Sequence, residues 1–550
     1  ALIGIIVWVV RQKQNDSADY FLGGRDATWL AIGASIFASN IGSEHLIGLA
    51  GAGASSGMAM AHWEIQGWMI LILGWVFVPF YTRSMVYTMP EFLERRYNPQ
   101  SRTILSVISL VSYVLTKVAV TVYAGGLVFQ QVFGIKELWG IDFFWIAAIG
   151  LVVLTALYTI FGGMKSVLYT SVLQTPILLL GSLIILVLGF KELGGWDEMM
   201  RVCGAVTVND YGDTMTNLIR SNDDANFPWL GALIGSAIIG FWYWCTDQFI
   251  VQRVLSGKNE MEARRGTIFG AYLKLLPVFL FLIPGMIAFA LHQKYIGAGG
   301  EGFLPMLANG TANADAAFPT LVAKLLPAGV KGLVVCGILA ALMSSLASLF
   351  NSSAMLFTID FYKRFKPETP EKKLVGIGQI ATIVIVVLGI LWIPIMRSVG
   401  DVLYTYLQDV QSVLAPGIAA AFLLGICWKR TSAQGGMWGL ISGMVIGLTR
   451  LGAKVYYSNA GEVADSTFKY LFYDMNWLFF CGWMFLFCII VVIVVSLATE
   501  APTAEKIQGL VFGTATKKQK AATRASWNHW DIIHTVIILA ITAAFYWYFW

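Results

Sequence analysis

The sequence predicts an all-α polytopic membrane protein with about 14 transmembrane helices, and three observations lead to this prediction. Of its 550 residues, 57% are hydrophobic and only 13% are charged, which is too little charge for a soluble domain of this size. Apolar runs of membrane-spanning length recur along the whole chain, and the loops between them alternate in charge. Near the start, one apolar run is interrupted by polar residues at a depth where lipid would surround it.

Hydropathy defines the individual spans. The first is expected to be the remainder of a truncated helix, because the sequence starts at Ala1 within an apolar run. The segment 318–327 is too short to cross a bilayer and is expected to be an external, interfacial helix. We place the spans at about 1–10, 28–58, 63–82, 103–132, 142–161, 165–190, 229–252, 266–292, 329–361, 373–396, 400–427, 434–453, 476–498 and 530–550.

Loop charge sets the expected orientation. Loops 83–102, 253–265, 362–373 and 499–529 are rich in Lys and Arg, whereas loop 191–228 is acidic. Basic loops stay in the cytoplasm, so both chain termini are expected to lie outside it. The net charge of +5 then reflects this loop bias and gives no reason to expect nucleic-acid binding. We expect a multi-pass protein of the plasma (cell inner) membrane.

The span count also predicts an internal symmetry. The acidic loop separates the five spans from 28 to 190 from the five spans from 229 to 427. An odd number per half puts the second five in the opposite orientation, as an inverted repeat requires. The expected organisation is 1–27 as a truncated N-terminal helix and cytoplasmic linker, 28–190 as the first repeat, 191–228 as an extracellular loop, 229–427 as the second repeat, and 428–550 as three C-terminal helices.

The interrupted helix is the first candidate site. Its polar break runs from Ser39 to His45, between apolar runs on both sides. Lipid offers no partner for free backbone N–H and C=O groups, so irregular backbone at that depth must be buried in protein or face a wet cavity. In secondary transporters, such breaks hold the ion and the substrate.

Ionisable residues inside spans extend this hypothesis. Glu64 could line a site or be an exposed first-turn acid, and Lys274 could bind solute or pair with a carboxylate between helices. Asp247, close to Arg253, is expected to form a structural ion pair, and Lys117 is either structural or lines the pathway. Aromatic residues lie near these groups, and together the two kinds of side chain suit a polyol, which needs hydrogen bonds for its hydroxyls and flat apolar faces for its C–H groups.

A second polar cluster contains Ser344 and Ser345, although serine in a membrane helix commonly bonds back to its own preceding turn. If this cluster faced the broken helix, the carbonyls of Ala38, Ile41 and Ala341 with two hydroxyls would give five neutral oxygens. Such a set suits Na⁺ better than a transition metal. The six cysteines are scattered without a CxxC pair, so neither a zinc site nor a disulfide framework is expected.

Six motifs occur in order between about residues 20 and 450. They are Ser39-Asn-Ile-Gly-Ser-x-His45, Tyr87-Thr-Met-Pro-Glu91, Trp242-Tyr-Trp-Cys-Thr-Asp-Gln248 followed by Val251-Gln-Arg253, Tyr272-Leu-Lys274-Leu, Met343-Ser-Ser-Leu346 and Trp428-Lys-Arg430. With these motifs the chain resembles the sodium/glucose cotransporter branch of the sodium:solute symporter family. The resemblance implies a LeuT-like core of ten helices, alternating access and Na⁺-coupled uptake of a hexose such as glucose or galactose.

The resemblance also implies roles for individual residues. The gates would be Leu49, Trp63 and Tyr404 outside and Tyr243 inside, and the Na⁺ site would be formed by Ala38, Ile41, Ala341, Ser344 and Ser345. The residues implied to contact sugar are Asn40, His45, Glu64, Tyr243, Trp244, Lys274 and Gln408.

The chain departs from the family pattern at four positions. Gly240 stands where the family has a polar residue that contacts sugar, so one hydroxyl contact is missing or supplied by water. Ser171 and Ala347 replace the Asp and Thr of members with a second Na⁺ site, which predicts one Na⁺ per sugar. Glu44 replaces a small residue that is common in the animal proteins, and the resemblance gives it no role.

Other functions remain open at this point. A symporter for myo-inositol or another polyol would use the same features. A sugar-gated sensor or Na⁺ leak channel could share the fold, although a sensor is expected to carry a soluble signalling domain and the sequence ends in the apolar run 532–550. An enzyme is not expected, because no metal cluster, nucleophile elbow or phosphate loop is present. We expect no cofactor apart from Na⁺ as coupling ion, with hexose and lipid bilayer as partners and a monomer sufficient for transport.

Overall fold

The computed structural model describes residues 16–42, 44–307, 310–396, 403–459 and 464–550. The predicted span at 1–10 lies outside these ranges. The described chain is helical apart from loops and one short antiparallel pair, β1 (Glu137–Leu138) with β2 (Ile141–Asp142), in which Glu137 faces Asp142.

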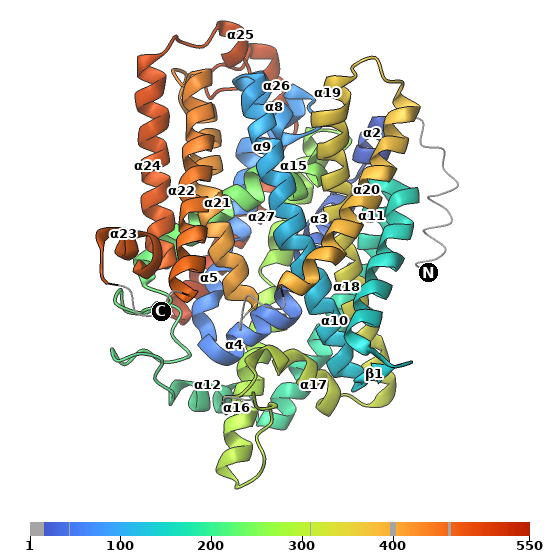
Figure 1. The fold of residues 1–550 in the computed structure, drawn as a ribbon, viewed down its shortest axis with the longest axis vertical. Helices are drawn as coiled ribbons and strands as arrows, with labels where there is room; N and C mark the ends of the chain where they lie inside the picture. The colour runs from blue at the N-terminus through green and yellow to red at the C-terminus, as the bar shows by residue number, and fades with distance from the viewer. Residues whose placement is uncertain (1–15, 43, 308–309, 397–402, 460–463) are drawn as a thin grey trace.

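Helices from the N-terminus to the acidic loop form the first group (Figure 1). They are α2 (Ser17–Leu22), α3 (Trp29–Asn40), α4 (Ala50–Ser56), α5 (Ala61–Glu64), α6 (Gly67–Ile72), α7 (Val78–Ser84), α8 (Met89–Arg96), α9 (Pro99–Ser112), α10 (Ala119–Phe133) and α11 (Phe143–Leu193).

Helices from the acidic loop to the C-terminus form the second group. They are α12 (Trp196–Gly204), α13 (Trp229–Gly240), α14 (Gln248–Leu255), α15 (Glu260–Lys274), α16 (Ile283–Gly297), α17 (Ala317–Leu325), α18 (Ala328–Met355), α19 (Lys363–Phe365), α20 (Glu371–Met396), α21 (Leu403–Cys427), α22 (Ala433–Asn459), α23 (Thr467–Lys469), α24 (Trp477–Ala498), α25 (Ala504–Ile507), α26 (Lys517–Ala525) and α27 (His529–Tyr548).

Short 3₁₀ and π-helical turns join many of these helices within a single span. The 3₁₀ turns are η1 (Gly23–Arg25), η3 (Gly57–Met60) and η8 (Ala314–Ala316). The π-helical turns are η2 (Glu44–Leu49), η4 (Leu73–Phe77), η5 (Tyr113–Val118), η6 (Phe241–Thr246), η7 (Val278–Leu282), η9 (Leu356–Tyr362) and η10 (Tyr470–Asp474). π-Helical turns in helices frequently mark functional sites, and two of these turns, η2 and η6, lie beside the site described below.

Within the described ranges, nine helical stretches are long and apolar enough to cross a membrane. One of them, α11, covers two predicted spans as a 51-residue helix, and its helical geometry breaks at Gly163, where φ is 51°. This is the position at which the hydropathy pattern separates the spans 142–161 and 165–190. The predicted external helix at 318–327 is present as α17.

Helix starts follow ordinary capping chemistry. Thr88 accepts from the N–H of Glu91 at 3.2 Å and starts α8, and Asn98 accepts from the N–H of Ser101 at 2.8 Å and starts α9. A proline follows each cap in the first turn, where its missing N–H costs nothing. These two starts fix the turn between the third and fourth predicted spans.

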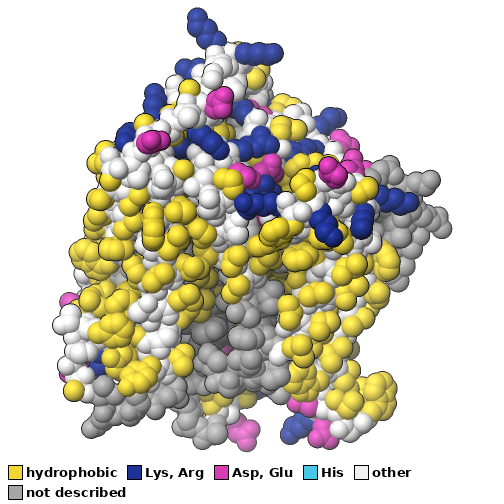
Figure 2. Space-filling model, turned by 45° about the horizontal axis from the view of Figure 1, so that its top comes forward, with side chains coloured by type: hydrophobic (Ala, Val, Ile, Leu, Met, Phe, Trp, Pro, Cys, Tyr) yellow, Lys and Arg dark blue, Asp and Glu magenta, His cyan; other side chains and the backbone are white. Residues whose placement is uncertain are grey.

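Charged side chains separate the two ends of the molecule. The loops that carry α8, α19, α25 and α26 lie together at the top of Figure 1, and Figure 2 shows Lys and Arg gathered over this end above an apolar flank. We call it the basic end. α12, α16 and α17 lie at the opposite end. By the charge rule for loops, the basic end is the predicted cytoplasmic side.

Helix packing places the broken helix at the centre. α3 packs against α15, α11 and α18, so it is surrounded by protein on several sides. α24 packs against α13, α21 and α22, and α27 packs against α6 and α15. Residues 39–42 and His45 of the predicted polar break are buried in protein, as the physics of lipid requires.

Candidate functional site

Two helix breaks face each other in the middle of the molecule. α3 ends at Asn40, and the chain resumes as η2 at Glu44. The second break lies where η6 gives way to α14 through Asp247, whose backbone is extended. The two breaks are joined by a hydrogen bond in which Asn40 Nδ2 donates to Tyr243 Oη at 3.2 Å. The sequence predicted the first break and the importance of Tyr243, and the structure brings them together.

A cavity lies between these breaks. Its free space is about 40 Å³, enough for a few water molecules but not for a sugar ring, so side chains must move to admit a larger solute. All seven residues expected to contact solute line this cavity, with Trp63 of the outer gate. The lining residues are Asn40, Glu44, His45, Trp63, Glu64, Gln66, Ile239, Gly240, Tyr243, Trp244, Lys274, Leu407, Gln408 and Gln411.

A buried charge cluster forms one wall of the cavity. Lys274 Nζ lies 2.6 Å from Glu64 Oε2 and donates to Asn40 Oδ1 at 3.1 Å. His45 Nε2 lies 3.2 Å from the same Glu64 oxygen, and the Trp244 ring lies 5.4 Å from the ammonium. Glu64 is therefore buried and not an exposed first-turn acid. Lys274 does pair with a carboxylate between helices, and both partners of this pair also line the cavity.

Gln66 is a cavity residue that the sequence analysis missed. Its Nε2 donates to the Ser236 carbonyl at 2.8 Å, and its Oε1 accepts from the Trp244 indole N–H at 3.2 Å. A Cβ added at Gly240 would lie 2.5 Å from Gln66 Oε1. The amide of Gln66 therefore occupies the space that a polar side chain at 240 would need, and it supplies polar atoms near the position where a contact was expected to be missing.

Helical spacing concealed Gln66, because positions 64 and 66 lie on different faces of a regular helix. In the structure α5 ends at Glu64 and α6 begins at Gly67, so the residues between them leave the helix and both side chains reach the cavity. Glu44 and Gln411 were also missed as lining residues. The only signal in the sequence was the polarity of these residues within apolar segments.

The ring of Tyr243, the predicted inner gate, lies against the buried ammonium group of Lys117. Lys117 Nζ lies 4.7 Å from the centre of the Tyr243 ring and between 4.8 and 5.3 Å from three other aromatic rings, those of Tyr113, Trp242 and Phe249. The ammonium is 2.5 Å from Asp247 Oδ2.

Asp247 is held by further donors. Its Oδ1 accepts from the Tyr113 hydroxyl and from the Phe249 N–H. The expected ion pair of Asp247 is thus formed with Lys117. The neighbouring Arg253 instead donates to the Phe249 carbonyl. Proximity in the sequence favoured Arg253 as the partner of Asp247. Lys117 lies in η5, in another span, and no local sequence pattern could indicate its contact with Asp247.

The structure describes the side chains of two of the three residues in the predicted outer gate, Trp63 and Leu49. Trp63 lines the cavity and is buried, with its ring stacked on Trp477 at a centroid distance of 5.5 Å. Leu49 is fully buried at the end of η2. The side chain of Tyr404 lies outside the part of the structure that is described.

The five residues expected to bind Na⁺ are all buried, on α3 and its end and on α18. The two segments touch: Ser39 Oγ lies 2.6 Å from Ser348 Oγ, and a Cβ added at Gly42 would lie 3.0 Å from Ser345 Oγ. The same Cβ would lie 2.8 Å from Glu44 Oε2, so a carboxylate stands beside the predicted site. Ala38 is among the last four residues of its helix, whose carbonyls lack partners in a regular helix.

The chemistry of these groups fits a hard monovalent cation. Ser171 Oγ lies 3.2 Å from Ser344 Oγ and donates its hydrogen bond to the Val167 carbonyl. The Ser344 hydroxyl can therefore donate to Ser171 Oγ and keep its own lone pairs for a cation. Neutral oxygens beside one carboxylate suit Na⁺. Among the described residues there is no group of three or more His, Cys, Asp or Glu side chains that could hold a metal ion.

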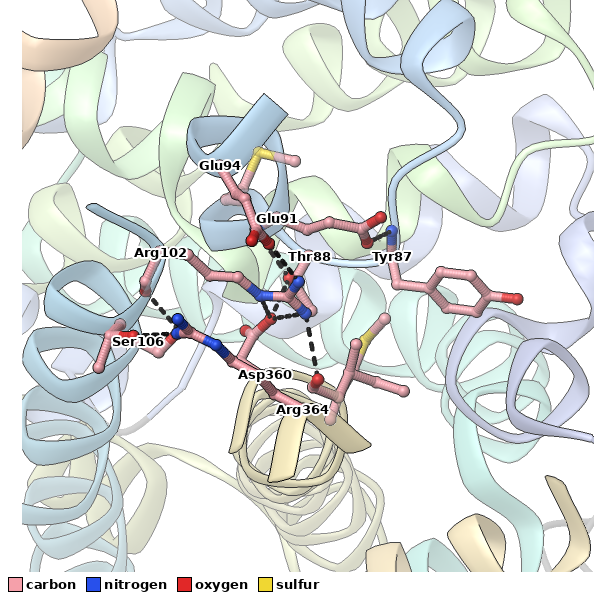
Figure 3. Close-up of polar contacts among 12 residues, drawn as sticks. Tyr87, Thr88, Glu91, Glu94, Arg102, Ser106, Asp360 and Arg364 are labelled. Atoms are coloured by element: carbon pink, nitrogen blue, oxygen red, sulfur yellow. Dashed lines mark hydrogen bonds and ion pairs between the residues drawn. The ribbon is translucent and has the colours of Figure 1, made fainter. Parts of the chain in front are cut away.

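A second, partly buried polar cluster lies at the basic end (Figure 3). Asp360 Oδ1 accepts from Arg102 Nε at 2.7 Å and from the Thr88 hydroxyl at 2.9 Å. Arg102 also donates to Glu94 at 2.6 Å. These contacts tie α8 and α9 to η9, which continues α18. The cluster thus fixes the predicted cytoplasmic turn between the third and fourth spans against the helix that carries Ser344.

Two helix breaks joined across a central polar cavity are typical of a membrane transporter, and the fold is LeuT-like. Residues 20–443 match the sodium:solute symporter family, and the chain belongs to it. It is a Na⁺-coupled solute symporter and not an enzyme, so these expectations from the sequence are confirmed.

Individual proteins resemble the chain over most of its length. Human sodium/myo-inositol cotransporter 2 is 36% identical over 527 residues, which cover 93% of this chain and 77% of that protein. Dog sodium/myo-inositol cotransporter is 37% identical over 536 residues, covering 93% and 74%. A solved Na⁺-coupled sialic acid symporter in a substrate-bound outward-open state has a TM-score of 0.72 at 22% identity, covering 91% of this chain and 98% of that one, and so shows the fold.

Proposed function

We propose that the chain carries a six-membered polyhydroxylated ring, with a hexose such as glucose or galactose as the expected solute, together with one Na⁺. The observation that supports this best is the cavity lining, in which Glu64, Lys274, Asn40 and His45 lie beside aromatic residues. Glu64 and Lys274 can exchange part of their mutual contact for hydroxyl groups, and Trp244 offers a flat face to the C–H side of a ring.

In the proposed cycle, Na⁺ binds first, at Ala38, Ile41, Ala341, Ser344 and Ser345. It links the end of α3 to α18 and so orders Asn40 and His45 for solute, which makes coupling a binding free energy shared by two ligands. Trp63 with Leu49 and Tyr404 then closes the site from outside, and Tyr243 must move before release inside. Gln408 and Gln66 add amide groups to the solute site.

One Na⁺ is sufficient for strong accumulation. A membrane potential of about 100 mV contributes about 2.3 kcal/mol per charge moved. A tenfold Na⁺ gradient adds about 1.4 kcal/mol, and the sum sustains a solute ratio of several hundred-fold. The proposal of a single Na⁺ rests on Ser171 and Ala347, which lack the charge and the hydroxyl of a second site. A measured ratio near two Na⁺ per solute would contradict it.

The second candidate solute is myo-inositol, favoured by the relatives named sodium/myo-inositol cotransporters. Both solutes are neutral six-membered rings with several hydroxyls, so both would form the same kind of hydrogen bonds with the charge cluster. They differ at the ring oxygen and the exocyclic carbon. Gly240, with Gln66 filling the space beside it, marks a place where this chain can discriminate between them.

The test is uptake of radiolabelled glucose, galactose and myo-inositol into proteoliposomes, with an inward Na⁺ gradient and an equal choline gradient as control. Uptake that overshoots equilibrium only with Na⁺ establishes symport of that solute, and unlabelled competitors rank the three. Na⁺-dependent uptake of none of them, by protein shown to be folded, would refute the proposed substrate class. Na⁺ flux without solute would indicate a leak channel, and binding without flux would indicate a sensor. We place the protein in the plasma membrane with its basic end in the cytoplasm.

A further inference from the structure

The predicted outer gate residue Trp63 lies in a wall of aromatic rings that come from outside its own span. Its ring stacks on Trp477 at 5.5 Å with an angle of 22° between planes. The Phe227 ring meets it edge-on at 6.2 Å. Trp63 and Trp477 are 4% and 8% exposed, so the stack is buried. Trp477 is the first residue of α24, beyond the ten helices of the predicted core.

The start of α24 is fixed in place from two sides. Asn476 caps the helix by accepting from the Leu478 N–H at 2.8 Å, and its Nδ2 donates to the Ala225 carbonyl at 2.7 Å. Leu478 packs on Gly231 and Gly235 of α13, where an added Cβ would lie 3.1 and 2.8 Å from it. Trp477 is therefore held against both the acidic loop and α13.

The last helix, α27, reaches the residue next to the gate. His62 Nδ1 lies 2.9 Å from the Tyr546 hydroxyl, and His62 Nε2 lies 3.1 Å from the Leu218 carbonyl. A neutral imidazole satisfies both contacts in one tautomer, with Nε2–H donating to the carbonyl and Nδ1 accepting from the tyrosine. The Leu218 N–H in turn donates to the Phe549 carbonyl at 3.0 Å. The acidic loop, α5 and the end of α27 are thus joined at one place.

We propose that α24 and α27 form the fixed outer half of the extracellular gate. Trp477 is the surface on which Trp63 rests when the site is closed, and Tyr546 orients the turn that carries Trp63 through His62. Both are positioning residues, since neither lines the cavity. An aromatic pair of this geometry favours the closed gate by about 2- to 10-fold in the ratio of closed to open molecules.

The first test needs no solute, so it does not depend on the proposed function. Gln411→Cys places a reporter thiol in the cavity, in a background where the exposed Cys336 and Cys427 are changed to Ser. A small charged methanethiosulfonate reagent is added to right-side-out vesicles, and the labelling rate is measured. Trp477→Ala is compared with Trp483→Ala, because Trp483 lies on the same helix but is 63% exposed.

We expect Trp477→Ala to accelerate labelling about 2- to 10-fold and Trp483→Ala to leave the rate unchanged. Trp477→Phe keeps an aromatic face and should give an intermediate rate, which keeps the test valid if the alanine variant folds poorly. Tyr546→Phe, which loses one hydrogen bond, should accelerate labelling by a smaller factor. Equal labelling rates in Trp477→Ala, Trp477→Phe and Trp483→Ala would overturn the inference.

Uptake measurements distinguish this inference from the proposed function. Only the expected effect of the gate variants on transport rests on the proposed function. With Gln411 intact, Trp477→Ala should raise KM for the solute several-fold with a smaller change in kcat, whereas general destabilisation lowers the amount of active protein at constant KM. Faster labelling with no uptake of any tested solute by wild type would refute the substrate proposal and support the gate. Normal uptake with unchanged labelling would support the substrate proposal and refute the gate.

Discussion

Replacing Lys117 by Met should destabilise the protein and impair its inner gate. The Lys117 ammonium is buried, 2.5 Å from Asp247 Oδ2, and lies against four aromatic rings that include Tyr243. Methionine keeps the length of the side chain but removes the charge. Asp247 would then be a buried carboxylate without its cation, and breaking such a pair costs about 3–5 kcal/mol. Since Asp247 keeps two hydrogen-bond donors, in Tyr113 and Phe249, we expect about 3 kcal/mol.

A double-mutant cycle isolates the free-energy cost of leaving the Asp247 carboxylate without its cation. Asp247→Asn removes the unpaired charge, so the double variant Lys117→Met/Asp247→Asn should recover at least half of the stability lost in Lys117→Met alone. Thermal denaturation of the purified proteins in one detergent, followed by size-exclusion chromatography, gives the order of stability. Tyr243 loses its cationic support in both variants, so both should transport more slowly than wild type even at equal amounts of folded protein.

Two results would refute this reasoning. If Lys117→Met denatures at the wild-type temperature, the pair carries no net stability. If the double variant is no more stable than Lys117→Met, the loss comes from packing of the methionine and not from the unpaired carboxylate. Normal uptake by the double variant would show that Tyr243 does not depend on the cation below it.

Three further predictions concern other parts of the protein. Arg102→Met should lower stability by about 3–5 kcal/mol, because it strips the buried Asp360 of its cation, and in an Asp360→Asn background the same change should cost much less in thermal denaturation. Gln66→Ala should raise the solute KM about tenfold through loss of an amide beside Gly240, and an unchanged KM would remove Gln66 from the solute site. Ser345→Ala should raise the Na⁺ concentration for half-maximal uptake about tenfold while leaving the ranking of competing solutes unchanged, and a changed ranking would place the serine with the solute instead.

The sequence predicted the features that depend on local composition. Apolar runs predicted a helical membrane protein, and the described residues contain nine helical stretches long and apolar enough to cross a membrane. The polar run from Ser39 to His45 predicted the central break, because backbone groups in lipid must find partners within the protein. The predicted boundary between the spans 142–161 and 165–190 coincides with the break in helical geometry at Gly163, although the structure continues the two segments as one element. Charge in an apolar segment was likewise sufficient to select Glu64 and Lys274 as site candidates.

Features that depend on contacts between distant segments were not predictable in this way. Asp247 was assigned the wrong partner because Arg253 is near in sequence, whereas Lys117 is 130 residues away. Gln66 was missed because the helix ends between it and Glu64, which no periodicity shows. The stack of Trp63 on Trp477 joins residues more than 400 positions apart and depends only on how α24 packs.

Two buried ion pairs at and beside the cavity bear on how the transporter responds to voltage, while Glu44, which also lines the cavity, belongs to neither pair. Glu64 pairs with Lys274, and Asp247 pairs with Lys117. When each pair moves as a unit, it carries no net charge through the membrane field. A neutral solute adds none, so the current that accompanies transport is expected to come from the ion. If Glu44 stays in place during the cycle, the ratio of charge to solute counts the Na⁺ ions carried in each cycle.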